Sequence, residues 1–188
     1  MALTQPIRNP KDVQKLLTYF KNQGDTRNYL LATIAIHTAL RISDILNLNC
    51  NHVYDFEKRK VRKQVTLIEQ KSKKPKIIAL NKAIISVLKS YLPQASPNTP
   101  LILNKKTGNA ISRIQAYRII RQASEAIELE SKVSCHSLRK TFGYHAWKNG
   151  ASPVLLMDIY NHSSYNITKR YLGITQDDKN TVFRNLNI

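Results

Sequence analysis

Apolar positions recur at helical spacing along most of the chain. The clearest set is Val13, Leu16, Leu17 and Phe20, which follow the Asn-Pro pair at 9–10 and stand at i, i+3, i+4 and i+7. This spacing puts the four side chains on one face, and Pro suits the first turn of a helix, so an amphipathic helix is predicted here. Similar patterns predict helices over roughly 27–40, 43–48, 82–92, 112–127 and 136–149, from 152–153 onward, and over 164–173 and 177–186.

The period changes after the second predicted helix. Three short runs, 53–56, 61–69 and 76–80, predict strands joined by charged connections. We therefore expect a mainly α-helical fold with one small three-stranded antiparallel β-sheet, an α+β class. No internal repeat or clear linker divides the sequence, and the PQASPNTP loop at 93–100 is too short to mark a domain boundary. A single domain is expected over residues 1–188.

The chain is strongly basic, with 30 Lys and Arg against 12 Asp and Glu and a formal net charge of +18. A polyanion is the expected partner, and nucleic acid comes first because neutralised phosphates release condensed counterions. An anionic membrane surface is the rival, but no apolar run approaches the roughly 20 residues that span a bilayer. The N-terminus has no secretory pattern and the two cysteines form no CxxC pair, so a cytoplasmic protein with reduced thiols is expected.

Two arginine-containing segments offer chemistry for a phosphate. His136 and Arg139 stand at i and i+3 at the start of a predicted helix, so both side chains face the same way. Arginine binds phosphate through a planar charged fork, and histidine moves protons near neutral pH. Arg41 follows an apolar helix and needs an anionic partner if it is buried, for which Asp44 is a candidate. Taken alone, these segments also fit a surface Arg beside a capping His and a structural Arg–Asp pair.

The order of the segments is more informative than any one of them. An Arg in TALRISDILNL, a Lys in IEQKSKKPKIIAL, the His-x-x-Arg of CHSLRKTFGYHAW and a His and Tyr in YNHSSYNITKRYLGI succeed one another along the chain. This order closely resembles the tyrosine recombinase, or phage integrase, family from about residue 10 onward. The resemblance implies the fold of that family's catalytic domain and a site-specific recombinase or integrase that cleaves and rejoins DNA. It also implies a 3′-phosphotyrosyl intermediate and a reaction without metal, ATP or another cofactor.

The resemblance assigns a role to each matched position. The catalytic residues that it implies are Arg41, Lys71, His136, Arg139, His162 and Tyr171, with Asp44 as the support of the first arginine. The two arginines stabilise the phosphate, and Tyr171 is the nucleophile. His136 acts as acid or base toward that tyrosine, and His162 hydrogen-bonds the phosphate.

Several lysines of the predicted hairpin compete for one role. Lys71 matches the family's pattern and would protonate the departing 5′-oxygen, but Lys73, Lys74 and Lys76 lie along the same loop. These three lysines are also candidates for contact with the DNA backbone. Further candidate DNA contacts, on the helix predicted over 112–127, are Arg113, Arg118 and Arg121.

The sequence departs from the family in three places. Tyr160-Asn161-His162 stands where Leu-Gly-His is usual, and Asn is expected to preserve a left-handed turn there. Lys140 and Gly143 stand where His and Ala are frequent, and neither change removes a catalytic group. The N-terminal helical domain with which family members usually clamp DNA is expected to be absent.

Two functional hypotheses follow. In the first, the protein is an active recombinase that assembles as a homo-tetramer on double-stranded DNA in the cytoplasm, at the nucleoid; supercoil relaxation, as in type IB topoisomerases, is a variant of it. In the second, the protein is a DNA-binding regulator or remnant integrase that keeps the fold without full recombination. The intact set of catalytic positions favours the first. The segment 175–188 is expected to pack on a neighbouring protomer or on its own domain.

Overall fold

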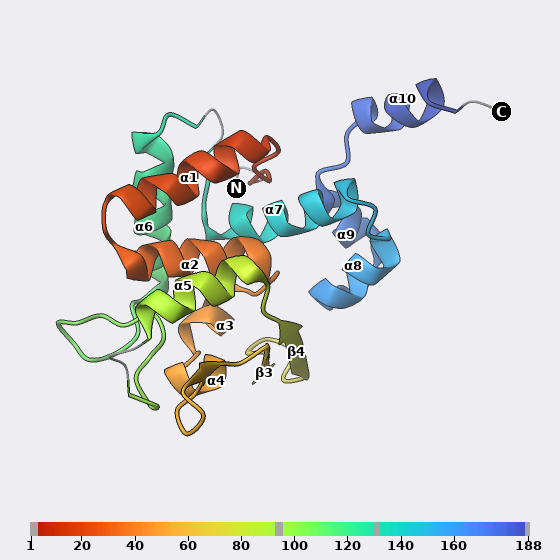
Figure 1. Cartoon of the computed structure of the whole chain (residues 1–188). Helices are drawn as coiled ribbons and strands as arrows, with labels where there is room; N and C mark the ends of the chain where they lie inside the picture. Colours follow the sequence, from red (N-terminus) through yellow and green to blue (C-terminus); the bar gives the residue numbers. More distant parts are fainter. Residues whose placement is uncertain (1–3, 93–95, 130–131, 187–188) are drawn as a thin grey trace.

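The computed structural model describes residues 4–92, 96–129 and 132–186, and helices make up most of its regular elements (Figure 1). The helices are α1 (Pro10–Asn22), α2 (Thr26–His37), α3 (Ile42–Leu46), α4 (Cys50–Val53), α5 (Lys82–Tyr91), α6 (Arg113–Ala126), α7 (Cys135–Lys148), α8 (Pro153–Tyr160), α9 (Tyr165–Leu172) and α10 (Gln176–Arg184). The mainly helical class is thus confirmed, with α4 as a helix that the hydrophobic pattern did not predict. The start of the predicted loop, 93–95, lies outside the described residues. Across the described ranges, no helix combines the length and apolar character needed to cross a bilayer.

Side-chain caps fix where several of these helices begin. The Asn9 side chain accepts a hydrogen bond from the Lys11 amide at 2.9 Å, directly before the proline that opens α1. Asn81 does the same for α5, where its side chain accepts from the Ile84 amide at 3.0 Å. Ser112 opens α6 with a capping box. Each cap satisfies an amide that has no partner within the helix, which explains why short polar residues mark these boundaries.

Two hydrophobic clusters hold the chain together. The major core surrounds α2, which is buried along seven consecutive residues and packs against α1, α5 and α7 (Figure 1). Its members include Leu30 and Leu31, which are completely buried. A small cluster of four buried residues, Ala39, Leu156, Tyr160 and Leu172, joins α8 and α9 to the start of the α3 region. The helix α7 connects the two, because it contacts α2 as well as α8 and α9.

The predicted three-stranded sheet is wrong in its pairing. The structure has two separate two-stranded antiparallel ladders, β1 (Tyr54–Asp55) with β2 (Lys60–Val61) and β3 (Gln64–Ile68) with β4 (Pro75–Ala79). The predicted middle strand breaks after Val61, and its two halves pair with different partners. The Arg62 amide bonds the Val53 carbonyl at 2.8 Å, whereas the Lys63 carbonyl accepts from the Leu80 amide at 2.8 Å. Alternation of apolar residues gave the strands, but it does not encode which neighbour each half takes.

The C-terminal helix stands away from the rest of the molecule (Figure 1). One ion pair, between Lys148 and Asp178 at 2.6 Å, ties its first turn to α7. Val182, Phe183 and Leu186 are 69%, 78% and 68% exposed, so these apolar side chains do not pack on their own domain. Of the two expectations for this segment, packing within the chain is therefore wrong for these three residues.

Candidate active site

Five of the six predicted catalytic residues line one cavity of about 1200 Å³. They are Arg41, Lys71, His136, Arg139 and Tyr171. The sixth, His162, lies beside the nucleophile candidate, with 4.6 Å between the ring centroids of His162 and Tyr171. These residues come from the start of α3, the β3–β4 turn, the first turn of α7, the turn after α8 and the end of α9. The fold therefore gathers segments that lie up to 130 positions apart in the chain (41 to 171) around a single opening.

The partner of Arg41 is Glu69 and not Asp44. Arg41 Nη1 lies 2.9 Å from Glu69 Oε1, and Lys76 Nζ lies 3.4 Å from the same oxygen. The Glu69 side chain is only 2% exposed. Its other oxygen accepts from the Ser72 hydroxyl at 2.8 Å and from the Asn161 amide at 3.4 Å. Burial alone would raise the pKa of Glu69, but the Ser72 hydrogen bond and the two cations outweigh it and lower that pKa.

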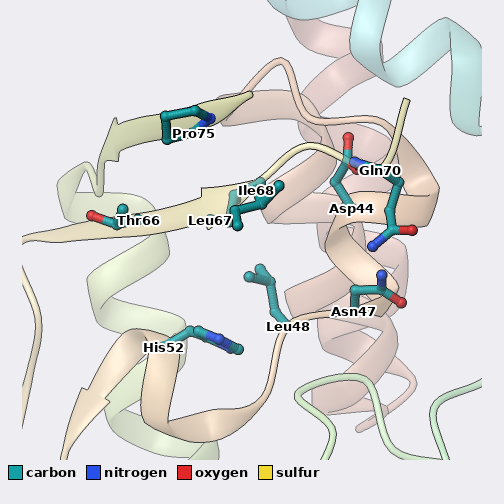
Figure 2. A pocket seen from close by; sticks show the side chains of 9 residues that line it. All are labelled: Asp44, Asn47, Leu48, His52, Thr66, Leu67, Ile68, Gln70 and Pro75. Carbon is teal, nitrogen blue, oxygen red and sulfur yellow. The ribbon is translucent and has the colours of Figure 1, made fainter. Parts of the chain in front are cut away.

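Asp44 does not line the cavity and instead binds the backbone of the β3–β4 turn. Its Oδ1 accepts a hydrogen bond from the Gln70 backbone amide at 2.9 Å, and Figure 2 shows the two side chains next to each other. Of the predicted site residues, Asp44 alone reaches the neighbouring pocket of about 410 Å³, which is walled mainly by apolar groups such as Leu48 and Ile68 (Figure 2). The predicted Arg41–Asp44 pair is thus replaced by a bond that fixes the backbone next to Glu69.

Arg139 is buried at the centre of the site. Its guanidinium donates to the carbonyl oxygen of Ala39 and, through Nη2 at 3.2 Å, to that of Tyr160. Ala39 has φ +55°, a left-handed conformation uncommon for a residue with a side chain. Within the described residues, Arg139 Nε is buried without a hydrogen-bond partner. Burial and then the charge of Arg41 lower the pKa of this guanidinium, which stays charged in proteins.

Both candidate histidines are held in the neutral form. Removal of water and then the charges of Lys140, Arg139 and Arg41 together lower the pKa of His136 to about 4. The pKa of His162 is also lowered to about 4, by burial first and then by the two arginines. His136 Nδ1 lies 3.3 Å from the Tyr171 hydroxyl, within reach of a weak hydrogen bond. At neutral pH, His136 can therefore accept a proton from that hydroxyl.

The sequence interpretation missed three residues of the site. Glu69 has a sequence signal, because it is the single acidic residue between Glu57 and Glu125 in a strongly basic stretch. Lys140 donates to the Thr4 carbonyl at 2.6 Å and lies 5.4 Å from the centre of the Tyr171 ring. Tyr160 contacts three of the predicted catalytic residues. Lys140 and Tyr160 are departures from the family pattern, but the sequence does not show that they contact the site.

The residues predicted to contact DNA lie on two parts of the chain, the β3–β4 hairpin and α6. Lys73 and Lys74 are exposed in the β3–β4 turn, whereas Lys76 is half-buried and also donates to the Ile159 carbonyl. On α6, Arg113 lines the cavity, Arg118 is exposed, and Arg121 is paired with Glu125 at 2.6 Å. In the three described stretches, no cluster of three or more His, Cys, Asp or Glu side chains is arranged to hold a metal.

Comparisons with known proteins were made on sequence and on structure. A model of the phage integrase family matches residues 8–177. The probable integrase/recombinase YoeC of Bacillus subtilis (strain 168) is 36% identical over 184 residues, which cover 98% of this chain and 97% of that protein. The tyrosine recombinase XerD of Corynebacterium glutamicum is 27% identical over 85% of this chain and 52% of its own length. The chain thus spans nearly the whole of one relative and about half of the other.

Solved structures give the same picture of the fold. The crystal structure of XerA recombinase superposes with a TM-score of 0.78 at 20% identity, over 98% of this chain and 68% of that one. The XerH site-specific recombinase, bound to its palindromic difH substrate in a post-cleavage complex, superposes with a TM-score of 0.73 at 19% identity, over 97% and 53%. At these identities the likeness shows a shared fold.

Proposed function

This chain belongs to the phage integrase family, and on that premise we propose that it is a site-specific recombinase that breaks and rejoins DNA strands by transesterification through Tyr171. One observation carries the assignment. The Tyr171 hydroxyl and the His136 imidazole meet at 3.3 Å at the wall of a cavity that is also lined by Arg41 and Arg139. A nucleophile, a proton acceptor and two phosphate-binding cations thus face one space.

In the proposed cleavage step, residues of the site accept and supply the protons that the bond changes require. The Tyr171 oxygen attacks the phosphorus and gives its proton to neutral His136, while the bond from phosphorus to the 5′-oxygen breaks. The strand is left with a 3′-phosphotyrosyl link and a 5′-hydroxyl, whose proton comes from a lysine. Arg41 and Arg139 stabilise the charge on the non-bridging oxygens, and His162 hydrogen-bonds one of them. The reverse step rejoins DNA without ATP, because the ester bond is conserved in the covalent link.

Lys71 and Lys76 are the two candidates for protonating the leaving oxygen. Lys71 is exposed and lines the cavity, whereas Lys76 is held by Glu69 and by the Ile159 carbonyl. Because Lys76 would have to leave two partners, we assign the proton to Lys71. A duplex whose scissile 5′-oxygen is replaced by sulfur separates the two, since a thiolate leaves without a proton. Lys71→Ala should lose cleavage of the oxygen substrate and regain it with sulfur. Lys76→Ala should show no such selective rescue, and the reverse pattern would move the role to Lys76.

The partner that fits this chemistry is double-stranded DNA. The formal charge of +18 and the exposed lysines of the β3–β4 turn supply contacts to phosphates. XerH, one of the proteins with the same fold, was solved on a DNA substrate. A homo-tetramer on two duplexes remains the expected working assembly, and the nucleoid in the cytoplasm is the place where such a substrate lies.

A covalent-trapping assay tests the proposal. The protein is incubated with nicked suicide duplexes from the DNA next to its gene, and denaturing gels are read for a protein–DNA adduct. The expected result is an adduct that Tyr171→Phe abolishes and that Tyr165→Phe keeps. Tyr165 is the matched control, because it is an exposed tyrosine at the start of the same helix α9. DNA binding by the unchanged protein without any adduct would favour a DNA-binding regulator.

A further inference from the structure

Tyr160 lies at the end of α8, is completely buried, and faces three of the groups assigned to catalysis. Its ring stacks on that of His162, with 5.0 Å between centroids and an angle of 15° between planes. The guanidinium carbon of Arg139 lies 4.8 Å from the ring centre. The ring of Tyr171 lies 5.1 Å away. One side chain thus packs against a phosphate-binding arginine, a histidine and the nucleophile.

Polar contacts fix this ring relative to α7. The Tyr160 hydroxyl donates a hydrogen bond to the Arg139 carbonyl oxygen at 2.8 Å, and Arg139 Nη2 returns one to the Tyr160 carbonyl oxygen at 3.2 Å. The two residues therefore bind each other through backbone and side chain at once. A leucine at this position would keep apolar volume, but it has neither the flat face that attracts a guanidinium nor the hydroxyl.

The tyrosine fits because the facing residue of α7 is glycine. A Cβ built on Gly143 would lie 2.8 Å from Cε2 and 2.9 Å from Cζ of Tyr160, and closer still to the hydroxyl oxygen. Glycine inside a helix is otherwise unfavourable relative to alanine, so its presence within α7 has a local cause. The aromatic ring occupies the space that a side chain at 143 would fill.

We propose that Tyr160, admitted by Gly143, is a positioning residue that holds Arg139, His162 and Tyr171 in the arrangement needed for strand cleavage. This role rests on the proposed function. Tyr160 touches no DNA, because it is completely buried, and acts only through the three groups around it. Its removal should therefore slow the chemical step at saturating DNA and leave DNA affinity unchanged.

Four variants separate positioning from simple packing: Tyr160→Leu, Tyr160→Phe, Gly143→Ala and the double variant Gly143→Ala/Tyr160→Leu. The rate of adduct formation should fall by about 10- to 100-fold in Tyr160→Leu, the size of effect that misplaced groups produce. Tyr160→Phe keeps the stacked ring and should lose less. Gly143→Ala should slow the reaction and lower the melting temperature, although alanine favours a helix. The double variant refills the volume, so its melting temperature should recover while its rate stays at least about fivefold below that of the unchanged protein.

A second readout needs no DNA. Burial is the first cause of the lowered pKa of His162, and the stacked ring of Tyr160 covers one face of that imidazole. NMR titration of Tyr160→Leu should therefore show this pKa rising by about one unit or more. Tyr54→Leu is the matched control, because Tyr54 also packs against an aromatic ring, Phe56 at 4.9 Å, outside the cavity. It should leave both the His162 pKa and the adduct rate unchanged.

The outcomes distinguish the inference from the proposed function. If the unchanged protein forms no adduct with any duplex while the His162 pKa rises in Tyr160→Leu, the proposed function fails and the positioning contact stands. If the unchanged protein forms the adduct and the double variant regains the full rate together with its melting temperature, Tyr160 is a packing residue and the inference is overturned. An unchanged His162 pKa in Tyr160→Leu overturns it as well.

Discussion

The two halves of the candidate site rest on hydrophobic clusters of very different size. Arg41 opens α3, whose Ile45 and Leu46 belong to the major core around α2. Tyr171 and His162 lie beside the small cluster of four buried residues. In that cluster, Leu172 directly follows Tyr171 in the chain, and Tyr160 stands two positions before His162. The side that carries Arg41, a proposed phosphate ligand, is thus anchored in the major core, whereas the side that carries Tyr171, the proposed nucleophile, is held by few apolar contacts.

This difference predicts that the nucleophile helix opens more easily than the arginine side. Segments with few buried apolar contacts unfold locally at a lower free energy than the core does. Arg139 spans the two parts, since it donates to Ala39 before α3 and to Tyr160 at the end of α8. We therefore predict that α8 and α9 move relative to the start of α3, with Arg139 as the link between them.

The largest effect is expected from the linking arginine. Arg139→Lys should lower the rate of adduct formation by about 10²- to 10³-fold, because lysine cannot replace the planar fork that contacts both carbonyls and is proposed to bind the phosphate. The measurement is a single-turnover rate on a suicide duplex. Arg118→Lys, an exposed arginine on α6, is the control and should react at nearly the original rate. Equal rates for both variants would contradict the central place of Arg139.

Cavity mutations compare the two clusters directly. Leu30→Ala in the major core and Leu172→Ala in the small cluster each remove a completely buried leucine, at a cost of about 2–5 kcal/mol. Leu30→Ala should lower the free energy of global unfolding by this amount. Leu172→Ala should instead raise amide exchange mainly in α8 and α9, with a smaller shift of the global transition. Similar exchange patterns in the two variants would mean that the clusters unfold as one unit.

The buried carboxylate should matter to stability and to its pH dependence. Glu69→Gln leaves Arg41 and Lys76 without their anion, so unfolding should become easier by roughly 3 kcal/mol. Since the pKa of Glu69 is lowered from 4.5, its contribution is present above that pH and is lost as the pH falls through the lower folded-state value. Denaturant titrations from pH 7 to 3 should show the variant and the parent converging at the acid end.

A surface pair provides the control for this variant. Glu125 pairs with Arg121 on α6 and is 57% exposed, so Glu125→Gln should change stability by less than about 1 kcal/mol. The difference in unfolding free energy between Glu125→Gln and the parent should be too small for a change with pH to be measurable. A loss as large as that of Glu69→Gln would contradict the role of burial.

A further pH effect concerns His136 and His162, the two histidines beside the proposed nucleophile Tyr171. Their pKa values of about 4 lie below the usual 6.5, so the folded state binds these protons more weakly than the unfolded chain. Their contribution to stability is therefore full above pH 6.5 and is lost as the pH falls toward 4. NMR titration of the free protein should place both midpoints well below 6. Ordinary midpoints near 6.5 would show that the site is open to water.

The sequence predicted the helices because apolar spacing and caps are local signals. Asn161 is an example: its predicted left-handed turn is confirmed, with φ +53° directly after α8. The prediction of one three-stranded sheet was wrong, because strand pairing depends on neighbours that the local pattern does not specify. The order of motifs identified residues of which five line one cavity, but it named Asp44 as the partner of Arg41, whereas the partner is Glu69, 28 positions away.

The unusual residues around the nucleophile mark the limit of sequence reasoning. Tyr160 and Gly143 each stood out as a departure from the family pattern, yet nothing in the sequence shows that they touch. Their interlock follows from the packing of α8 on α7, which places a ring carbon 2.8 Å from where a Cβ would stand. Lys140 similarly reaches Thr4, 136 positions away. Contacts of this range are decided by tertiary packing.

The most direct measurement is to locate the DNA on the protein. An adduct formed with a suicide duplex is digested with nuclease and trypsin, and the modified peptide is sequenced by mass spectrometry. Cleavage after Arg170 and Lys179 gives the peptide that begins with Tyr171. A 3′-phosphonucleotide on Tyr171 is the predicted result. Attachment to another residue, such as Tyr165, or a link through the 5′-phosphate would contradict Tyr171 as the nucleophile of this reaction.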